Sequence, residues 1–218
     1  MVRLALTMNA GNIPFGQVEE IWRSLWFSRF GPNKLRLRFE LGGDGLNNTT
    51  QQVPRFLQAH GRACTIADFL FSEICVGVVA WHPQSKQSTI GAPRVRTGFQ
   101  ALEATGFRAK QIASWQANLY PDLEEEQGDW MVRCYELGGN KVSRDTLLWH
   151  DVALEMPIYP SACITSVLID PSQKLMMHVY DDRGMDLIAA DARTLEPTYR
   201  RFRDWLLGYD RERMAKLF

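Results

Sequence analysis

Hydrophobic and polar residues follow a regular pattern over residues 174–218, which predicts two strands joined by a tight turn and then a helix. Leu175, Met177 and Val179 fall on one face of the first strand, because successive side chains of a strand point to opposite faces. Asp181 to Gly184 (DDRG) then supplies turn residues, since Asp favours the start of a turn and Gly tolerates positive φ. A second apolar strand follows, so the segment predicts a β-hairpin.

After this hairpin the apolar residues recur every three or four positions, which predicts a long amphipathic helix. Thr194 is its expected N-cap, with Pro197 in the first turn, where a missing N–H costs little. The apolar stripe is rich in aromatic residues, so we expect the helix to dock on a core with Trp205 buried. The stripe consists of Leu195, Tyr199, Phe202, Trp205, Leu206 and Tyr209.

The same periodicities divide the rest of the chain into helices and strands. Helices are predicted at residues 15–30, 51–71, 97–105 and 143–156. A break near Gly61 is an alternative for the second, and Ser143 is the expected N-cap of the last. Strands are predicted at residues 34–40, 74–81, 110–120, 130–137 and 163–169, with a further candidate at 2–8. The run 74–81 is apolar throughout, which is typical of a central strand covered on both faces.

These elements predict one α+β (mixed α/β) domain over residues 1–218. Its central sheet is expected to be covered by helices and closed by the C-terminal β-hairpin and long amphipathic helix. Residues 38–43 (RFELGG) are echoed by residues 134–139 (CYELGG), and a helix and an apolar strand follow each copy. The echo suggests a strand–helix–strand duplication over 35–81 and 130–170, although chance recurrence of six residues is the alternative.

The C-terminal hairpin and helix also resemble a known family. The stretch Met176 to Phe218, which contains HVYDDRGMDLIAAD and GYDR, is similar to the C-terminal signature of a bacterial family known only as a domain of unknown function. Members of that family end in a strand–DDRG–strand–helix–YDR pattern, and Arg38 to Gly42 (RFELG) resembles their N-terminal strand. The resemblance implies one mixed α/β domain from a bacterium. The family has no agreed activity, so the resemblance implies no catalytic or binding residue.

Composition narrows the classes of function. Hydrophobic residues make up 45% of the 218 residues and seven are Trp, which predicts a substantial core. Lys plus Arg and Asp plus Glu both number 25, so the chain lacks the strongly basic character that is typical of nucleic-acid-binding domains. No apolar run reaches about 18 residues, so no membrane span is expected. The N-terminus has no apolar core and cleavage site of the kind found in signal peptides.

The four cysteines are Cys64, Cys75, Cys134 and Cys163. They lie far apart in apolar surroundings, and no two of them form a CxxC pair. We therefore expect free thiols in a reducing cytoplasm, the alternative being disulfides in a periplasmic protein.

A group of acidic residues in the hairpin is the main candidate for chemistry. Asp181, Asp182 and Asp186, with His178 and Asp191 beside them, could offer oxygen ligands to Mg²⁺ or Ca²⁺. The alternative is a turn shaped by Asp and a helix capped by Asp191, because Asp is favoured at such positions for backbone reasons. No metal-binding spacing supports a site, so we expect no metal, no cofactor and no catalytic residue.

Two charged segments are candidates for binding a partner. The acidic one contains Asp122, Glu124, Glu125, Glu126 and Asp129. The basic one contains Arg200, Arg201 and Arg203, and continues to Arg211 and Arg213. Basic residues on one arc of a helix can hold an acidic partner or a phosphate, but a solvated face paired with neighbouring carboxylates is the alternative.

Three classes of function remain open. We expect a non-catalytic, cytoplasmic protein-binding module, most plausibly an immunity-type protein that neutralises a bacterial toxin, because Trp and Arg are suited to anchoring interfaces. A metal-dependent hydrolase or nuclease would use the Asp181 to Asp191 cluster. A regulator that binds nucleic acid would use the basic arginines, although neutral net charge does not favour it.

Overall fold

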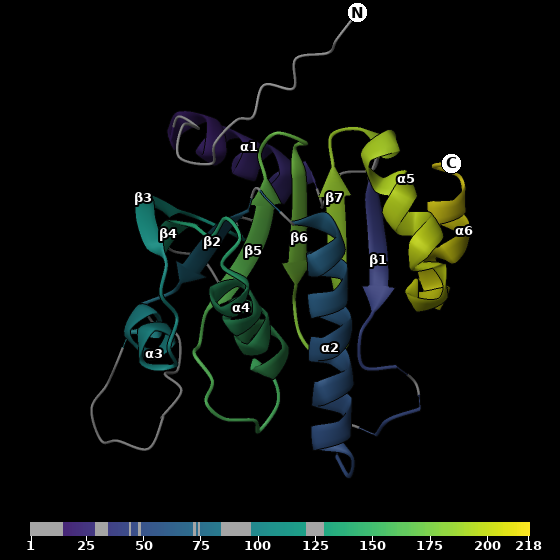
Figure 1. Ribbon diagram of the computed structural model, residues 1–218, viewed down its shortest axis with the longest axis horizontal. Helices are drawn as coiled ribbons and strands as arrows, with labels where there is room; N and C mark the ends of the chain where they lie inside the picture. Colours follow the sequence, from purple (N-terminus) through teal and green to yellow (C-terminus); the bar gives the residue numbers. More distant parts are fainter. Residues whose placement is uncertain are drawn as a thin grey trace, which may run out of the picture.

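A seven-stranded antiparallel sheet in the order β1-β7-β6-β5-β2-β4-β3 is the centre of the molecule (Figure 1). The computed structural model describes residues 15–28, 35–43, 45–47, 49–71, 73, 75–83, 97–120 and 129–218. The strands are β1 (Arg36–Glu40), β2 (Val76–Trp81), β3 (Lys110–Ala117), β4 (Trp130–Glu136), β5 (Thr165–Asp170), β6 (Leu175–Val179) and β7 (Gly184–Ala189). The hairpin predicted from the DDRG turn is the β6–β7 pair, in which Val179 lies opposite Met185.

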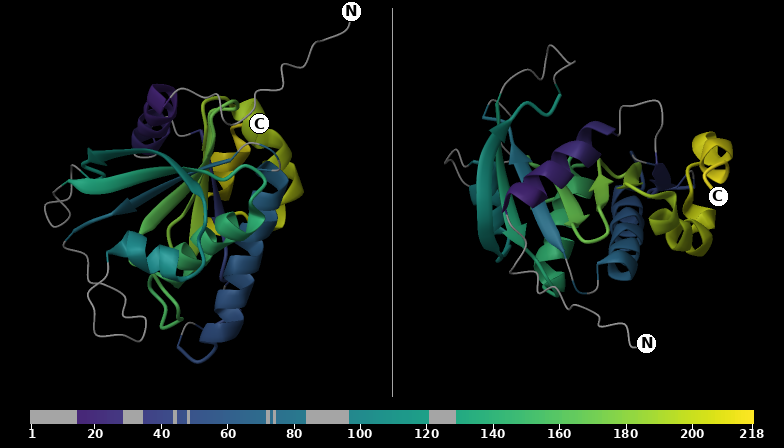
Figure 2. Two further views of the ribbon diagram at one scale, coloured as in Figure 1. Left: turned by 60° about the vertical axis from the view of Figure 1, so that its left-hand side comes forward. Right: turned by 90° about the horizontal axis from the view of Figure 1, so that it is seen from above.

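Helices cover both faces of this sheet. They are α1 (Phe15–Ser28), α2 (Gln52–Leu70), α3 (Gly98–Ala104), α4 (Lys141–Ala153), α5 (Ala192–Arg201) and α6 (Arg211–Ala215), with 3₁₀ turns η3 (Arg203–Trp205) and η4 (Gly208–Asp210). Helices α2 and α4 lie on one face and α1 on the other, while α5 and α6 lie beside β1 (Figures 1 and 2). The predicted α+β class with a helix-covered sheet is confirmed. Among the described residues, no helix is long and apolar enough to cross a membrane.

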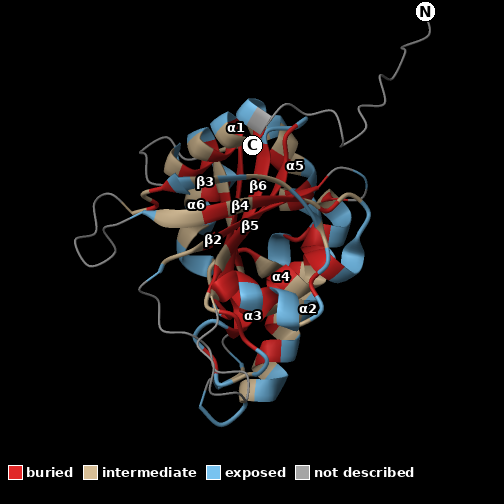
Figure 3. Cartoon of the chain, turned by 90° about the vertical axis from the view of Figure 1, so that its left-hand side faces the viewer, coloured by how far each residue is buried: buried red, intermediate tan, exposed pale blue. Residues whose placement is uncertain are grey.

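The sheet separates two hydrophobic cores. Phe56 of α2 and Leu147 of α4 belong to the larger core, and Trp22 of α1 belongs to the other. Strand β2 contributes to both, with Val79 in the first core and Val78 in the second. The apolar run predicted as a central strand is therefore covered on both faces, and strands β5 and β6 beside it are buried as well (Figure 3).

Local hydrogen bonds set the helix boundaries. Thr97 and Gln100 form a reciprocal capping box at the start of α3, which lies within the helix predicted at 97–105. Helix α4 begins earlier than predicted, because Asn140 accepts a hydrogen bond from the Ser143 N–H at 3.1 Å and is the N-cap. Ser143 is instead buried in the first turn, where its hydroxyl donates to the Arg108 carbonyl at 2.7 Å.

The C-terminal helix is shorter than predicted and begins at a different cap. Asp191, not Thr194, caps α5 by accepting a hydrogen bond from the Arg193 N–H at 2.9 Å. The predicted long helix is divided into α5, η3, η4 and α6, because Leu206 adopts an extended conformation and forms a β-bridge with Phe39 of β1. A tertiary contact therefore interrupts a stripe that has helical spacing in the sequence.

Residues 206–214 cover the outer edge of β1. The Leu207 N–H donates to the Arg38 carbonyl at 2.9 Å, and Arg213 Nη2 donates to the Arg36 carbonyl at 3.0 Å. Groups at a strand edge that would otherwise face solvent are thus bonded within the chain. At the opposite end of the sheet, β3 pairs with β4.

The two suggested repeats correspond to β1–α2–β2 and β4–α4–β5. In both units the helix lies on the same face and joins two strands that run in the same direction. The units differ in how far apart their two strands lie in the sheet. Strands β7, β6 and β5 lie between β1 and β2, whereas only β2 lies between β4 and β5. The duplication stays a prediction, and the candidate strand at 2–8 lies outside the described residues.

Candidate functional site

Segments far apart in sequence meet at the turn between β6 and β7. Glu40 lies opposite Gly184, and the Leu41 N–H donates to the Arg183 carbonyl at 3.0 Å. The first turns of α2 complete this corner through Arg55. The two sequence segments singled out above, RFELG and DDRG, are therefore neighbours in the fold.

Asp182 binds α2 to this corner. Arg55 Nε donates to Asp182 Oδ2, and both side chains are largely buried, at 12% and 8% exposed. The same guanidinium donates to the carbonyls of Gly43 and Leu46 at 3.0 and 2.9 Å. One ion pair therefore fixes the turn, the loop after β1 and the start of α2 together.

Asp181 shapes the turn itself. One carboxylate oxygen accepts the Arg183 backbone N–H at 2.7 Å, and the other accepts Arg183 Nε at 2.7 Å. The Arg183 guanidinium also reaches Glu155 at 3.2 Å, and its hydrogen bond to Asp181 raises the pKa of the arginine. Asp181 thus makes the local contacts that favour Asp in turns.

Gly184 has no room for a side chain. A Cβ built there would lie 2.3 Å from the Tyr180 hydroxyl oxygen and 2.7 Å from the Phe39 carbonyl oxygen. Close backbone approach, and not a positive φ as the turn pattern suggested, accounts for this glycine.

Asp186 binds a different pair of arginines. It accepts hydrogen bonds from Arg36 Nη1 at 3.0 Å and from Arg38 Nε at 3.2 Å, both from the neighbouring strand β1. His178 lies opposite Asp186 across β6 and β7, with its ring centre 5.1 Å from that of Trp26.

The hairpin carboxylates therefore do not converge as a ligand set. Asp181, Asp182 and Asp186 each bind separate arginines, while Asp191 caps α5. Within the described part of the chain, no group of three or more His, Cys, Asp or Glu side chains could hold a metal ion. Each of these residues has a structural partner instead.

A cysteine and a histidine do meet on α2. Cys64 Sγ lies 3.5 Å from His60 Nε2, which is also 3.1 Å from the Asp145 carbonyl oxygen. Burial, with the nearby Asp145 carboxylate, raises the pKa of the Cys64 thiol to about 12. The thiolate is the nucleophilic form, so this environment opposes nucleophilic catalysis. All four cysteines are free, as predicted.

A second polar group is fully enclosed near the end of α4. His150 Nδ1 accepts the Ala162 N–H at 3.0 Å, and Nε2 lies 2.8 Å from Thr105 Oγ1, which donates to the Leu102 carbonyl. This arrangement places the proton on Nε2, and burial lowers the pKa of His150 to about 4. The ring is therefore neutral and serves as a fixed hydrogen-bonding link.

The neighbouring carboxyl group has the opposite shift. Asp151 is buried and accepts hydrogen bonds from the Ser166 N–H at 3.0 Å and the Ser166 hydroxyl at 2.5 Å. Burial raises its pKa well above the usual value of an Asp, and these two hydrogen bonds oppose the shift.

The predicted basic arginines separate into two groups. Arg200, Arg201 and Arg203 are exposed on α5 and η3, and Arg200 pairs with Glu196 at 2.6 Å. In contrast, Arg211 donates to the Leu206 carbonyl at 3.2 Å, and Arg213 holds β1 as described above. Arg211 is also exposed, whereas Arg213 is partly buried.

Aromatic rings lie beside Arg201. The Arg201 guanidinium lies 4.9 Å from the ring centre of Phe69 and 5.6 Å from that of Phe202. Trp205 stacks on Phe202 at 5.2 Å, and the Arg62 guanidinium lies 5.3 Å from the Trp205 ring. We call Arg62, Phe69, Arg201, Phe202 and Trp205 the arginine–aromatic surface.

Sequence reasoning did not find the α2 half of this surface. Arg62 and Phe69 are seven residues apart, two helical turns, and so lie on one face of α2. This seven-residue spacing is the feature of the sequence from which the α2 half of the surface could have been predicted. Trp205 is only half-buried, contrary to the prediction of a buried anchor, because its ring is shared between Phe202 and an arginine at the surface.

The acidic segment can be placed only at its end. Asp129 is exposed and directly precedes β4. Asp122, Glu124, Glu125 and Glu126 lie outside the described residues.

Comparison with known proteins identifies the family. Residues 16–210 match the family described as Domain of unknown function (DUF3885). Neither the curated proteins nor the solved structures contain a match. Because the match spans most of the 218 residues and includes both β1 and the β6–β7 hairpin, the chain belongs to the DUF3885 family of unknown function.

Proposed function

We propose that this protein is a non-catalytic module that binds another protein through the arginine–aromatic surface. The observation that carries the proposal is the set of stacked rings and guanidinium groups on α2, α5 and η3. Aromatic residues and Arg are enriched at protein interfaces, where a few of them provide most of the binding free energy. Phe69 is 38% exposed although it stacks on the edge of Phe202, so a large ring is available to a partner.

The charges around the surface suggest how a partner would approach. Arg200 and Arg203 extend the positive charge beside Arg201, so an acidic patch on the partner would be complementary. If the partner also has a basic surface, Glu124 to Glu126 are the residues that would steer it. Charges that steer an encounter change the association rate more than the final affinity.

The partner class that we propose is a bacterial toxin, which would make this chain an immunity-type protein. A cytoplasmic location fits this role, and the four free thiols support a reducing compartment. The hydrolase alternative has less support, because the carboxylates it would use are bound to arginines. The nucleic-acid alternative requires a positive field that a net charge of zero does not provide.

A capture experiment with matched variants tests this proposal. The tagged chain is expressed in its native host, and bound proteins are compared between the parent, Arg201→Glu and Arg193→Glu. Arg193 is the control, because it is also an exposed arginine on α5 but pairs with Asp191 at 2.9 Å. We expect Arg201→Glu to lose the partner and Arg193→Glu to keep it.

The recovered partner then allows two further measurements. Its expression alone should arrest growth, and co-expression of this chain should restore growth. Charge reversal at Glu124 to Glu126 should slow association most at low salt, because salt screens exposed charges. Equal capture by both arginine variants would refute the proposed surface. Failure to recover any partner, together with turnover of a phosphoester or amide by the purified chain, would refute the binding function.

A further inference from the structure

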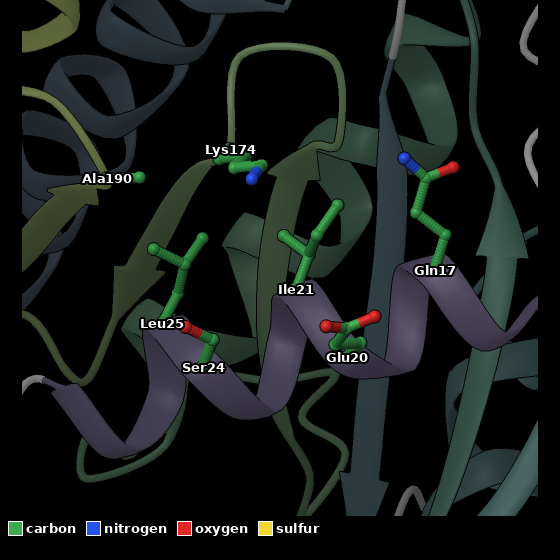
Figure 4. A pocket seen from close by; sticks show the side chains of 7 residues that line it. All are labelled: Gln17, Glu20, Ile21, Ser24, Leu25, Lys174 and Ala190. Carbon is green, nitrogen blue, oxygen red and sulfur yellow. The ribbon is translucent and has the colours of Figure 1, made fainter.

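A small pocket lies between α1 and two residues at strand ends, Lys174 before β6 and Ala190 after β7. It has a volume of about 170 Å³. Ile21 and Leu25 point from α1 toward Lys174 and Ala190, which lie across the pocket on the sheet side (Figure 4). Pockets for drug-sized ligands have volumes of roughly 300–1,000 Å³, so this one suits a smaller molecule.

The walls of the pocket divide into apolar and polar parts. Ile21 and Leu25 are almost fully buried and supply an apolar surface. Gln17, Glu20 and Ser24 add polar groups from the same helix. Their spacing of three and four residues places them along one side of α1.

Two exposed residues of opposite charge, Lys174 and Glu20, line the pocket. Among the residues that the structure describes, neither Lys174 nor Glu20 takes part in a side-chain hydrogen bond or ion pair, although the adjacent Glu19 pairs with Arg23 at 2.8 Å. A cation and an anion therefore line one pocket without neutralising each other. A ligand that carries both charges would pair with both residues.

The backbone at Lys174 adds an independent observation. Lys174 has φ of +48°, the positive φ among the described residues that is not at a glycine. It ends the four-residue turn between β5 and β6, and its carbonyl accepts the Ala190 N–H at 3.2 Å. Gly or Asn is favoured at such a position, so a lysine there is uncommon.

We propose that this pocket binds a free α-amino acid with an apolar side chain, whose carboxylate meets Lys174 and whose ammonium group meets Glu20. The apolar side chain would lie on Ile21 and Leu25. Charge-assisted hydrogen bonds at both ends would give specificity, since a ligand that lacks either charge leaves one residue unpaired. The pocket involves no residue of the arginine–aromatic surface, so this inference is independent of the proposed function.

Titration of the full chain with single amino acids tests the inference. The probes are L-alanine, L-valine, L-leucine, L-isoleucine and L-methionine, and the signal is the methyl resonance of Ile21. We expect a saturable shift with at least one of them. The N-acetyl derivative, which lacks the ammonium group, and the amide, which lacks the carboxylate, should each bind about tenfold more weakly or worse.

Variants of the charged residues provide the controls. Glu20→Gln and Lys174→Gly should each weaken binding about tenfold or more, whereas Glu19→Gln should leave it unchanged. Gly suits the backbone at position 174, so Lys174→Gly should melt no lower than the parent, and Lys174→Asn is a second variant that tolerates the same φ. No saturable shift at about 10 mM of any probe, well above a millimolar dissociation constant, would overturn the inference. Equal binding of the N-acetyl derivative, or unchanged affinity in both Glu20→Gln and Lys174→Asn, would also overturn it.

Discussion

Lowering the pH should destabilise this protein through His150. In the folded chain both ring nitrogens are engaged, one as acceptor from Ala162 and the other as donor to Thr105. Protonation would place a second N–H on Nδ1, facing the Ala162 N–H, in a site without solvent. The unfolded chain has no such restriction and takes up a proton near the ordinary pKa of 6.5.

The sign and size of the effect follow from the two pKa values. Because the folded pKa is depressed, the contribution of His150 to stability is fully present above pH 6.5 and is lost as the pH falls toward 4. The separation is two and a half pKa units, and each unit corresponds to about 1.4 kcal/mol, so the full loss that His150 causes well below pH 4 should be about 3.5 kcal/mol. That is a large fraction of the stability of an ordinary domain.

Urea unfolding at about pH 7.5 and about pH 4.5 measures this loss. Three chains are compared: the parent, His150→Gln, which cannot titrate, and His60→Gln as a control from the half-buried histidine on α2. His150→Gln will itself be less stable at neutral pH, since Gln cannot reproduce both hydrogen bonds. The informative quantity is the change between the two pH values, which should be about 2.5 kcal/mol smaller in His150→Gln than in the parent, because pH 4.5 is still above the folded pKa.

Equal pH dependence in the parent and His150→Gln would refute the reasoning. The raised pKa of Asp151 also makes stability depend on pH, in the opposite direction. It does not confuse the comparison, because the parent and His150→Gln both carry Asp151. Its carboxyl group costs stability as the pH rises above the ordinary Asp value, and this contribution is the same in both chains.

Three further outcomes are expected. Trp205→Ala should lower the free energy of unfolding by about 2 kcal/mol, below the 3–5 kcal/mol of a fully buried Trp, because the side chain is half-buried; an unchanged denaturant midpoint would contradict this. Asp182→Asn should cost about 3 kcal/mol, since it leaves the buried Arg55 without its counter-ion, and Asp191→Asn, at an exposed cap, should cost far less. Thermal melts with Mg²⁺, Mn²⁺, Ca²⁺ or EDTA should coincide, because the hairpin carboxylates are bound to arginines. A metal bound at 100 times its dissociation constant would add about 2.7 kcal/mol of stability and would be visible in the melt. A metal-dependent shift that Asp182→Asn abolishes would instead support the hydrolase alternative.

Periodicity predicted most elements, because it reports which side chains reach a core. The hairpin at Asp181 to Gly184 and the capping box at Thr97 depend on residues within a few positions, so local sequence is sufficient for them. Tertiary contacts decided the exceptions. Leu206 has helical spacing but leaves the helix to bond with β1, and Ser143 is a good cap that is instead needed by the Arg108 backbone.

The candidate sites were harder to predict, since they depend on pairs distant in sequence. Asp182 meets Arg55 across 127 positions, and Asp186 meets Arg36 across 150, so a cluster of carboxylates in sequence became separate ion pairs in space. The partners of Arg201 and Trp205 come from α2, and the pocket joins α1 to Lys174. No periodicity in one segment contains this information.

The covered edge of β1 limits how this protein can self-associate. A sheet with two open edges can add neighbours on both sides and grow without end, as fibrils do. Here residues 206–214 occupy bonding groups of β1, so of the two end strands only β3 could pair with another molecule. Two molecules joined through β3 would each present a closed edge outward, and growth would stop at a pair. A chain shortened before Leu206 would regain the second edge and, with it, the capacity to polymerise.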